Sequence, residues 1–471
     1  MNLFKKLNSS DIKYLVWKDL YKLNDFLNGN AELDLLVDIN QKNIFEKIIL
    51  KNGFISLKVN DLLEKKDVEH YIKFYNGKYF HLHIYYKLTT GNHFVKEYEF
   101  PLDKSLFSNY TLYNNIRVAS KELEIAFLIT RLIIKKSVLF QNIKVKELDR
   151  LANLSKACDT TSVLGHLKKI IPKTKASFQE LLSIALDEKG ISNINNSILK
   201  EFSNYKTLSG IRYAFKYLKI RLVLMYLRLN KSSNKTIKNK GIDFAILGSD
   251  GSGKTTISNS LFKQYRAKTS SKIFYLGGNF KTYSIVTRLC YLNYYFMRVF
   301  SPFKDKYYLA WLFYYNSFAM LELGKAYDRK RKIVRGGKLK SKGWVVIYER
   351  FPIIGLFDFP NQLLILKKNV WYNKSTSKFL RNIICQIELT INNLSRPDTS
   401  FLISTDFEKM KSRRDLAENE LIDINRKISL QNKYLKYNNE KLVKISNNGS
   451  LNTVINTINQ HINYKLCTFN S

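Results

Sequence analysis

The chain has 471 residues, of which 45% are hydrophobic and 25% are charged. This composition excludes a disordered or collagen-like protein and leaves room for two or three folded domains. The formal net charge of +39 indicates an acidic partner, such as a nucleotide, a nucleic acid, an anionic glycan or an anionic membrane surface.

Residues 1–115 mix strand and helix patterns and predict one α+β domain. The run 33–38 is short and apolar, as in a buried strand, and 40–51 carries apolar residues at helical spacing. Four further strands are predicted, at 54–60, 71–75, 78–88 and 94–100. Asn76–Gly77 separates two of them and predicts a tight β-hairpin.

The octapeptide AELDLLVD places Glu32 and Asp34 on one face of the first strand. It resembles the [DE]x[DE] strand of nucleotidyltransferase-like proteins, in which two carboxylates share Mg²⁺. The resemblance implies a nucleotidyltransferase-like domain with Glu32 and Asp34 as magnesium ligands. The usual upstream Gly-Ser is absent, and only Glu97 and Glu99 offer a third carboxylate. An active transferase, a binding domain without activity and no relation to these proteins therefore all stay open.

Residues 116–231 carry almost no strand pattern and predict a helical domain. Amphipathic helices are expected at 121–138, 163–171, 178–186 and 211–229. The last one mixes basic and apolar residues, which favours packing on its own protein, with anionic lipid as the alternative. The polar segment 232–240 is predicted to be a linker.

Residues 241–471 alternate strand and helix patterns to the end of the chain. Short apolar runs predict strands at 242–247, 272–276, 344–348, 400–404 and 441–445. Runs of this kind suit a parallel sheet that helices cover on both faces. The expected fold class is therefore α/β for this third block.

A phosphate-binding loop follows the first of these strands and opens a helix. Its sequence, GSDGSGKT over 248–255, matches GxxxxGK[ST]. The glycines let backbone N–H groups converge on phosphate oxygens, while Lys254 would neutralise the β- and γ-phosphates and Thr255 would hold Mg²⁺. The predicted ligands are ATP and Mg²⁺. The predicted nucleotide-binding residues are Gly248, Ser249, Asp250, Gly251, Ser252, Gly253, Lys254, Thr255 and Thr256.

The third block resembles thymidylate kinases over nearly all of its length. GSDGSGKTT resembles the loop of that family, in which an acid at the position of Asp250 contacts a sugar hydroxyl of the acceptor nucleotide. The run AYDRKRKIVRGGKLKSKGWVVIYERF resembles the family's arginine-bearing helix, strand and DR[YF] motif. The resemblance implies that Arg329 binds the acceptor phosphate. It also implies that Arg350 is the motif arginine, with Glu349 in place of the motif aspartate.

The stretch RPDTSFLISTDFEKMKSRRD resembles the family's lid region, which implies that Arg413 and Arg414 close over ATP. The acceptor side departs from the family. An Arg-Glu-Pro stretch is absent, Lys325 replaces a base-stacking aromatic residue, and 279–323 is unlike the family. We therefore expect an acceptor other than strictly dTMP.

The expected function is ATP–Mg²⁺-dependent phosphoryl transfer to a nucleotide, a sugar phosphate or a glycan. The predicted catalytic residues are Lys254, Arg350, Arg329, Glu349 and Asp250. Two alternatives stay open. One is an ATP-regulated protein that binds nucleic acid, and the other is a nucleotidyltransferase with an accessory P-loop domain. The oligomeric state is not predicted.

The sequence also favours a cytoplasmic protein, with peripheral contact to a membrane left open. The start of the chain lacks the apolar core of a signal peptide, and no run reaches the roughly 18 apolar residues of a spanning helix. The longest apolar run, Tyr307–Leu321, is interrupted by Asn316 and Ser317 and predicts a buried helix. The four cysteines are far apart and show no metal-binding spacing, which favours a reducing compartment.

Overall fold

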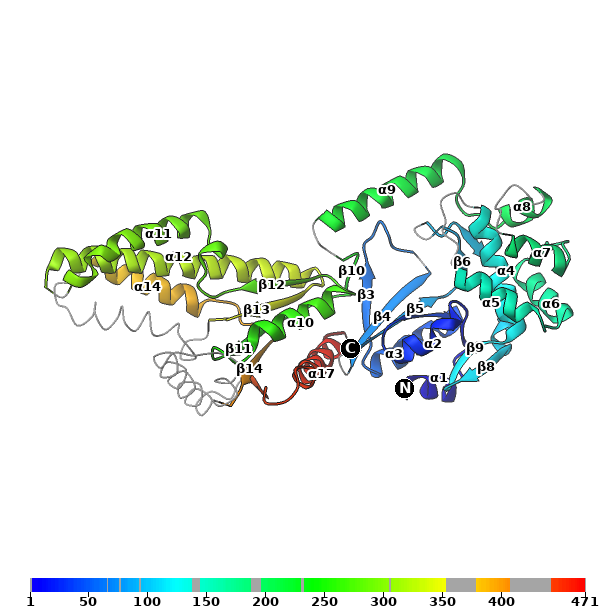
Figure 1. Ribbon diagram of the computed structural model, residues 1–471, viewed down its shortest axis with the longest axis horizontal. Helices are drawn as coiled ribbons and strands as arrows, with labels where there is room; N and C mark the ends of the chain where they lie inside the picture. The colour runs from blue at the N-terminus through cyan, green and yellow to red at the C-terminus, as the bar shows by residue number, and fades with distance from the viewer. Residues whose placement is uncertain are drawn as a thin grey trace. The chain divides into compact units, whose positions relative to one another are not determined.

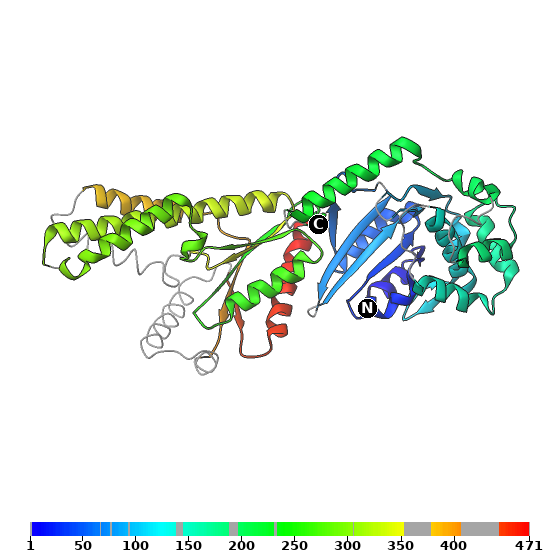
Figure 2. The same ribbon diagram turned by 45° about the horizontal axis from the view of Figure 1, so that its top comes forward.

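The computed structural model describes residues 2–470 except 66, 76–77, 93–94, 138–144, 188–195, 230–232, 305, 353–377 and 407–441. The chain forms two compact units (Figures 1 and 2). The N-terminal unit comprises Met1–Lys238 together with Asn463–Ser471, and the P-loop unit comprises Asn239–Ile462.

The N-terminal unit is built on a mixed sheet of eight strands in the order β10-β3-β4-β5-β2-β1-β9-β8. These strands are β1 (Tyr14–Val16), β2 (Glu32–Val37), β3 (Ile55–Val59), β4 (Val68–Tyr75), β5 (Lys78–Tyr85), β8 (Tyr110–Tyr113), β9 (Ile116–Ala119) and β10 (Lys235–Ile237). The pairs β2–β5 and β1–β9 are parallel, and the others are antiparallel. A separate antiparallel pair joins β6 (Leu88–Thr90) to β7 (Tyr98–Phe100).

One hydrophobic core joins the sheet of this unit to helices α1 (Asn2–Ser9), α2 (Leu23–Leu27), α3 (Lys42–Lys51), α4 (Lys121–Ser137), α5 (Val145–Ser155), α6 (Thr160–Ile170), α7 (Phe178–Leu186) and α8 (Asn196–Ser203). Helix α9 (Gly210–Leu229) is mostly exposed, with Ile220 buried, so the packing expected for it from the sequence involves little of its surface. Ile125 and Ile129 of α4 lie in the same core as Leu35 and Ile84 of the sheet. The sequence predicts two domains here, 1–115 and 116–231, whereas the shared core makes one unit.

Several differences from the sequence predictions involve short strands. Strands β1, β8 and β9 have three or four residues, too few to show a periodic pattern. Strand β10 lies inside the predicted linker 232–240 because its backbone pairs with the edge strand β3. Of the strand predicted at 94–100, only Tyr98–Phe100 forms, and it pairs outside the main sheet. The predicted turn at 76–77 lies outside the described residues.

The P-loop unit contains five parallel strands in the order β12-β13-β11-β14-β15. They are β11 (Ile242–Gly248), β12 (Ser271–Tyr275), β13 (Val345–Glu349), β14 (Thr399–Ser404) and β15 (Leu442–Ser446). Each agrees with a predicted strand to within one residue, so the predicted parallel sheet is confirmed. Strand β13 is the direct neighbour of β11, which brings the end of β13 beside the phosphate loop.

Helices cover both faces of this sheet (Figure 1). They are α10 (Lys254–Arg266), α11 (Ile285–Met297), α12 (Tyr308–Ser341), α14 (Lys378–Asn392) and α17 (Leu451–Asn470). On one face, Phe244 packs edge-on against Tyr265 of α10. On the other, Ala245 and Leu247 share a core with residues of α12 and α14 such as Ile333 and Leu380.

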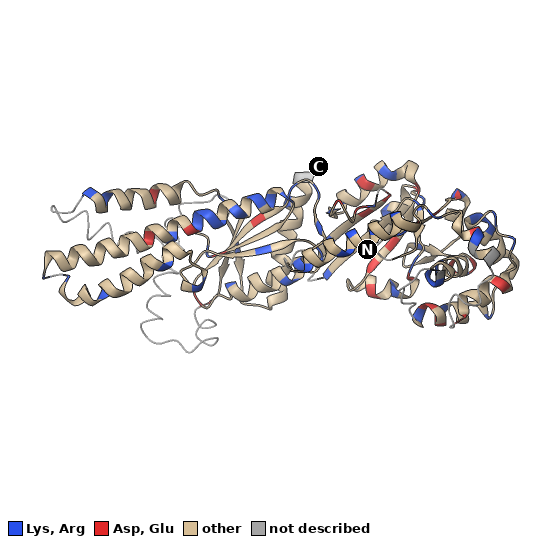
Figure 3. Cartoon of the chain, turned by 90° about the horizontal axis from the view of Figure 1, so that it is seen from above, with Lys and Arg blue, Asp and Glu red and all other residues tan. Residues whose placement is uncertain are grey.

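The long helix α12 is uneven in charge and burial. Its basic residues all lie in the half that begins at Lys325, and Figure 3 shows Lys and Arg over the chain. The segment predicted as a buried helix, Tyr307–Leu321, is only partly buried, because Trp311 and Tyr315 are covered while Phe313 is exposed. In the described part of the chain, no helix combines the length and apolarity that a membrane span requires.

Candidate nucleotide-binding site

The loop after β11 adopts the backbone that only glycine accommodates easily. Gly248, Gly251 and Gly253 have φ angles of 153°, 83° and 87°. A Cβ atom on Gly253 would lie 2.7 Å from the side-chain nitrogen of Asn447, and one on Gly248 would lie 2.6 Å from the carbonyl of Ile403. The loop conformation and its close packing therefore both require these glycines.

Side-chain hydrogen bonds hold the loop in place, from Ser252 within it and from Asn447 and Thr405, which follow β15 and β14. Ser252 donates to the carbonyl of Ser249 at 2.8 Å, and the Asn447 amide donates to the carbonyl of Ser252 at 2.8 Å. Thr405, which follows β14, donates to the same carbonyl at 3.4 Å. The sequence reasoning missed Asn447. The only signal was the polar run after β15, at the edge where parallel α/β sheets bind ligands.

Lys254 opens α10 and is almost fully buried, with 6% of its surface exposed. Its ammonium group donates to the Ser249 carbonyl and lies 3.6 Å from Asp250 Oδ1. Burial lowers the pKa of Lys254 to about 8, although the charge of Asp250 opposes the shift. The motif assigns the Lys254 ammonium group to phosphate. In this structure it interacts instead with the Ser249 carbonyl and with Asp250.

Thr255 and Glu349 meet beside the loop. The Thr255 hydroxyl donates to Glu349 Oε1 at 2.5 Å, and Glu349 is buried at the end of β13. A hydroxyl and a carboxylate are hard oxygen ligands of the kind that Mg²⁺ prefers, so this pair fits the predicted metal. Thr256 lies next on α10 and is exposed.

Arg350 follows β13 in a left-handed conformation, with φ of 59°. Its guanidinium donates to Asp250 Oδ1 at 2.9 Å and lies 5.7 Å from the centre of the Tyr275 ring. A non-glycine residue in this conformation needs surrounding contacts to hold it. Asp250 therefore lies between two cations, Lys254 and Arg350.

Arg329 reaches the same edge of the sheet from α12. Its Nε donates at 2.9 Å to the carbonyl of Leu276, directly after β12. Burial lowers the pKa of Arg329, and Glu322 opposes that shift. Arg350 lies beside the same segment, because a Cβ atom on Gly277 would lie 2.8 Å from its Cδ atom. Both arginines therefore lie against the segment 275–277.

The structure thus brings most of the predicted site residues together at the carboxyl edge of the parallel sheet. Thr255 contacts Glu349, and Asp250 of the phosphate loop contacts Arg350. The predicted lid residues Arg413 and Arg414 lie outside the described residues.

In the N-terminal unit, the two predicted magnesium ligands each face a histidine. Glu32 Oε1 lies 2.8 Å from His81 Nδ1, and Asp34 Oδ1 lies 3.0 Å from His83 Nδ1. Burial raises the pKa of Asp34, but the hydrogen bond from His83 outweighs it and the pKa falls to about 2. Glu99, a candidate third ligand, pairs instead with Lys87 at 2.7 Å.

Over the described residues, no group of three His, Cys, Asp or Glu side chains has a geometry that could hold a metal. Glu32 and Asp34 therefore do not form a complete metal site with a described third residue, and their assignment as Mg²⁺ ligands stays a prediction.

The sequence profile of the KAP family P-loop domain matches residues 224–464. The chain belongs to the KAP family. The matched region contains the whole parallel sheet and the phosphate loop, so this unit is a KAP P-loop NTPase domain that binds a nucleoside triphosphate. No curated protein matches the chain.

Two solved structures are similar to this KAP chain. One is the thymidylate kinase from Candida albicans, at 15% identity and a TM-score of 0.28, covering 48% of this chain and 94% of that chain. The other is the deoxyadenosine kinase from M. mycoides with bound dATP, at 15% identity and a TM-score of 0.29, covering 47% and 99%. Scores of this size assign no substrate to this chain. The nucleotidyltransferase resemblance of the N-terminal unit stays a prediction.

Proposed function

We propose that the KAP domain catalyses ATP–Mg²⁺-dependent phosphoryl transfer to an anionic acceptor. The observation that carries the proposal is the position of two arginines beside the phosphate loop. Arg350 contacts the loop through Asp250, and Arg329 contacts the segment 275–277 at the same sheet edge. Transfer between two anions needs cations on both the donor and the acceptor.

The donor side consists of the loop and the start of α10. Loop N–H groups and the N-terminus of α10 would bind the β- and γ-phosphates, and Lys254 would neutralise their charge. Thr255 and Glu349 would hold Mg²⁺, which would neutralise negative charge on the phosphates when bound. Strand pairing of β13 with β11 keeps Glu349 at this position.

The acceptor side consists of Arg329 and Arg350. Guanidinium groups donate two parallel hydrogen bonds to phosphate or carboxylate oxygens, so they orient an anionic acceptor as well as attract it. The acceptor oxygen forms a bond to the γ-phosphorus, the bond from that phosphorus to the β–γ bridging oxygen breaks, and ADP leaves. Asp250 must release Lys254 for the donor, and it then remains with Arg350 or binds an acceptor hydroxyl.

The acceptor class is a nucleotide, a sugar phosphate or a glycan end that carries an anionic group. Lys325, which replaces a base-stacking aromatic residue of thymidylate kinases, pairs with Glu322 at 2.6 Å. A charged pair at this position does not supply an aromatic face for thymine. The pairing therefore supports an acceptor other than dTMP.

A second candidate is ATP hydrolysis that controls binding to a partner. The KAP family match favours it, because the matched domain is an NTPase. The net charge of +39 then indicates nucleic acid or an anionic membrane as that partner.

The test is steady-state ADP formation by the full chain across a panel of nucleoside monophosphates, sugar phosphates and glycans. We expect one acceptor class to stimulate ADP formation, and Arg329→Ala or Arg350→Ala to raise the KM for that acceptor about tenfold or more. Arg335→Ala, an exposed arginine on the same helix as Arg329, is the matched control. ADP formation that no acceptor changes and nucleic acid stimulates would favour the second candidate.

A further inference from the structure

Helix α9 of the N-terminal unit leaves a row of large apolar side chains exposed. The members of the row recur every three or four residues, a spacing that aligns side chains on one face of a helix. Each is more than half exposed, and they are Ile211, Phe215, Leu218, Leu222, Met225 and Leu229. We call these six residues the apolar stripe. A continuous exposed apolar surface of this kind marks a place where a protein binds a partner or a membrane.

The opposite face of α9 is the one that packs. At about 100° per residue, Ile220 lies opposite the stripe, and it is the buried residue of this helix. Tyr213 lies on the same side as Ile220, and its ring centre is 5.8 Å from the ammonium nitrogen of Lys206. The packing that the sequence predicts for α9 therefore uses the face of Ile220 and leaves the stripe exposed.

Basic residues lie on both sides of the stripe. By the same helical spacing, three lie on one side and two on the other. In that order they are Arg212, Lys216, Lys219, Arg221 and Arg228, and all five are exposed. The helix contains no Asp or Glu. An apolar row between basic rows is typical of helices that lie in the plane of a membrane interface.

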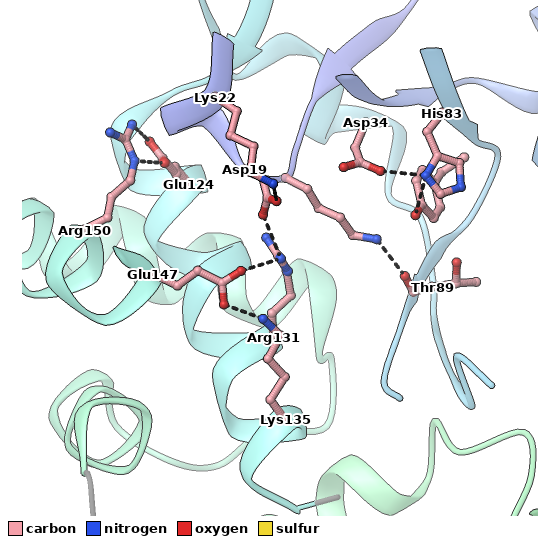
Figure 4. A network of polar contacts seen from close by, with 12 residues as sticks. Asp19, Lys22, Asp34, His83, Thr89, Glu124, Arg131, Lys135, Glu147 and Arg150 are labelled. Carbon is pink, nitrogen blue, oxygen red and sulfur yellow. Dashed lines mark hydrogen bonds and ion pairs between the residues drawn. The ribbon is translucent and has the colours of Figure 1, made fainter. Parts of the chain in front are cut away.

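The charges of α9 disfavour a second copy of the helix as the partner of the stripe. Within the same unit, α4 and α5 exchange opposite charges (Figure 4). Arg131 of α4 donates to Glu147 of α5 at 3.0 Å, and Arg150 of α5 donates to Glu124 of α4 at 2.7 Å. Since α9 has no carboxylate of its own, two stripes in contact would bring together five positive charges from each copy.

Nucleic acid matches the basic residues but not the stripe. Its attraction for proteins comes mainly from phosphate contacts, which six large apolar side chains between the basic rows do not make. An anionic bilayer matches both features. Its acyl region accepts apolar side chains, and its phosphates attract the long basic side chains that reach back to the surface.

We propose that α9 binds the surface of an anionic lipid bilayer, with the apolar stripe inserted and the basic residues at the level of the lipid phosphates. The helix lies along the surface and does not cross it, in agreement with the absence of a candidate span among the described helices. This is the alternative that the sequence leaves open for α9. It concerns where the chain binds and does not depend on the reaction proposed for the KAP domain.

The test is co-sedimentation of the full chain with lipid vesicles at about 0.15 M salt. The vesicles contain phosphatidylcholine alone, or phosphatidylcholine with about 30% phosphatidylserine, and we expect binding to the anionic vesicles to be about tenfold tighter or more. Leu222→Ser should weaken that binding about fivefold or more, because it removes an inserted apolar side chain. Leu222 and Ile44 of α3 are both 53% exposed, so Ile44→Ser is the matched control and should bind like wild type.

A charge variant separates binding through α9 from the general attraction of a basic chain. The double variant Lys219→Gln/Arg228→Gln removes two of the chain's 78 lysines and arginines, both beside the stripe. It should weaken binding to the anionic vesicles about tenfold. Lys5→Gln/Lys47→Gln removes two exposed lysines from α1 and α3 and should bind like wild type.

Sedimentation velocity without vesicles tests the other occupants of the stripe. Leu222→Ser should leave the oligomeric state unchanged. A wild-type dimer that Leu222→Ser dissociates would assign the stripe to a second copy and overturn the proposal, and so would binding to duplex DNA that the same variant weakens. Absence of vesicle binding, or equal binding by wild type, Leu222→Ser and the α9 charge variant, would also overturn it.

Discussion

The two units differ in how they compensate their buried cations. In the P-loop unit, Lys254 and Arg350 share one internal counter-ion, Asp250, at 3.6 and 2.9 Å. In the N-terminal unit, the ammonium nitrogen of buried Lys18 lies 3.9 Å from the ring centres of Trp17 and Tyr85 and donates to the carbonyl of Thr89. An internal carboxylate lowers the net charge of an ionic site before its ligand arrives, whereas ring faces and a carbonyl stabilise a cation without removing its charge.

The pairing in the P-loop unit determines how phosphate binds there. Phosphate must displace Asp250 and the Ser249 carbonyl from Lys254, so binding exchanges one set of contacts for another.

The largest expected effect is at Lys254. Lys254→Ala should lower ATP turnover by about a hundredfold to a thousandfold, because the donor phosphates lose their main neutralising charge. The measurement is ADP formation by the full chain at saturating Mg²⁺. The exposed residue Lys263, on the same helix, gives a matched control in Lys263→Ala, which should keep full activity. Unchanged turnover in Lys254→Ala would place the chemistry outside this loop.

A smaller effect is expected at Glu349. Glu349→Gln keeps the shape of the side chain and can still accept the Thr255 hydrogen bond, but it removes the negative charge that would help hold Mg²⁺. The Mg²⁺ concentration for half-maximal activity should rise about tenfold to a hundredfold. A magnesium titration of wild type and variant measures this. Equal magnesium requirements in the two proteins would show that Glu349 does not help to hold Mg²⁺.

Asp250→Asn tests the internal counter-ion directly. Removing this negative charge should tighten ATP binding about fivefold, because the carboxylate no longer competes with phosphate for Lys254. Acceptor-dependent turnover should fall, since Arg350 loses the partner that holds it.

The contrasting variant is Asp243→Asn, on β11, the strand that precedes the loop. Asp243 pairs with Lys340 at 2.8 Å, and its loss should lower the unfolding temperature without tightening ATP binding. The affinity of each variant for ATP, measured by calorimetry, tests whether only Asp250→Asn tightens binding. Weaker binding in Asp250→Asn would show that Asp250 supports the nucleotide rather than competing with it.

The smallest expected effect concerns the contribution of Lys65 to the stability of the N-terminal unit. Burial, with the charges of Lys96 and Lys216, lowers the pKa of Lys65 from its ordinary value of 10.5 to about 6. Since the pKa in the folded chain lies below that in the unfolded chain, the penalty is fully present below about pH 6 and decreases as the pH rises toward 10.5.

Lys65→Met should therefore raise the unfolding temperature by about 3 °C near pH 6, and the gain should shrink at higher pH. Calorimetry between about pH 6 and pH 9 measures this, with Lys5→Met as the control. A gain that grows with pH would contradict a destabilising buried charge at Lys65.

The parallel sheet could be predicted from the sequence because each strand is a short apolar run and the phosphate loop fixes the first one. The same loop motif identified Lys254 and Thr255. Family resemblance supplied Glu349 and Arg350, and the strand order explains why these residues lie beside the loop. Strand β13 is the neighbour of β11, so residues far apart in the sequence meet at one edge. Asn447 carried no motif and emerged only from its contact with the loop.

The N-terminal unit was harder to predict for two physical reasons. Strands such as β1 and β10 have three residues and take their stability from pairing with neighbours, which leaves no periodic signal. Lys18 carries no sequence motif, in a chain with 78 lysines and arginines. Only the fold shows that Lys18 differs from the others, because it is buried against Trp17 and Tyr85.

The most direct test of the proposed function is the fate of the labelled γ-phosphate of ATP during turnover by the full chain. Wild type and Lys254→Ala are incubated with Mg²⁺ and the acceptor that most stimulates ADP formation, and products are separated. Phosphoryl transfer predicts that the label appears on the acceptor in proportion to ADP and that Lys254→Ala abolishes both. Label recovered only as inorganic phosphate, with every acceptor, would contradict phosphoryl transfer and identify the KAP domain as a hydrolase.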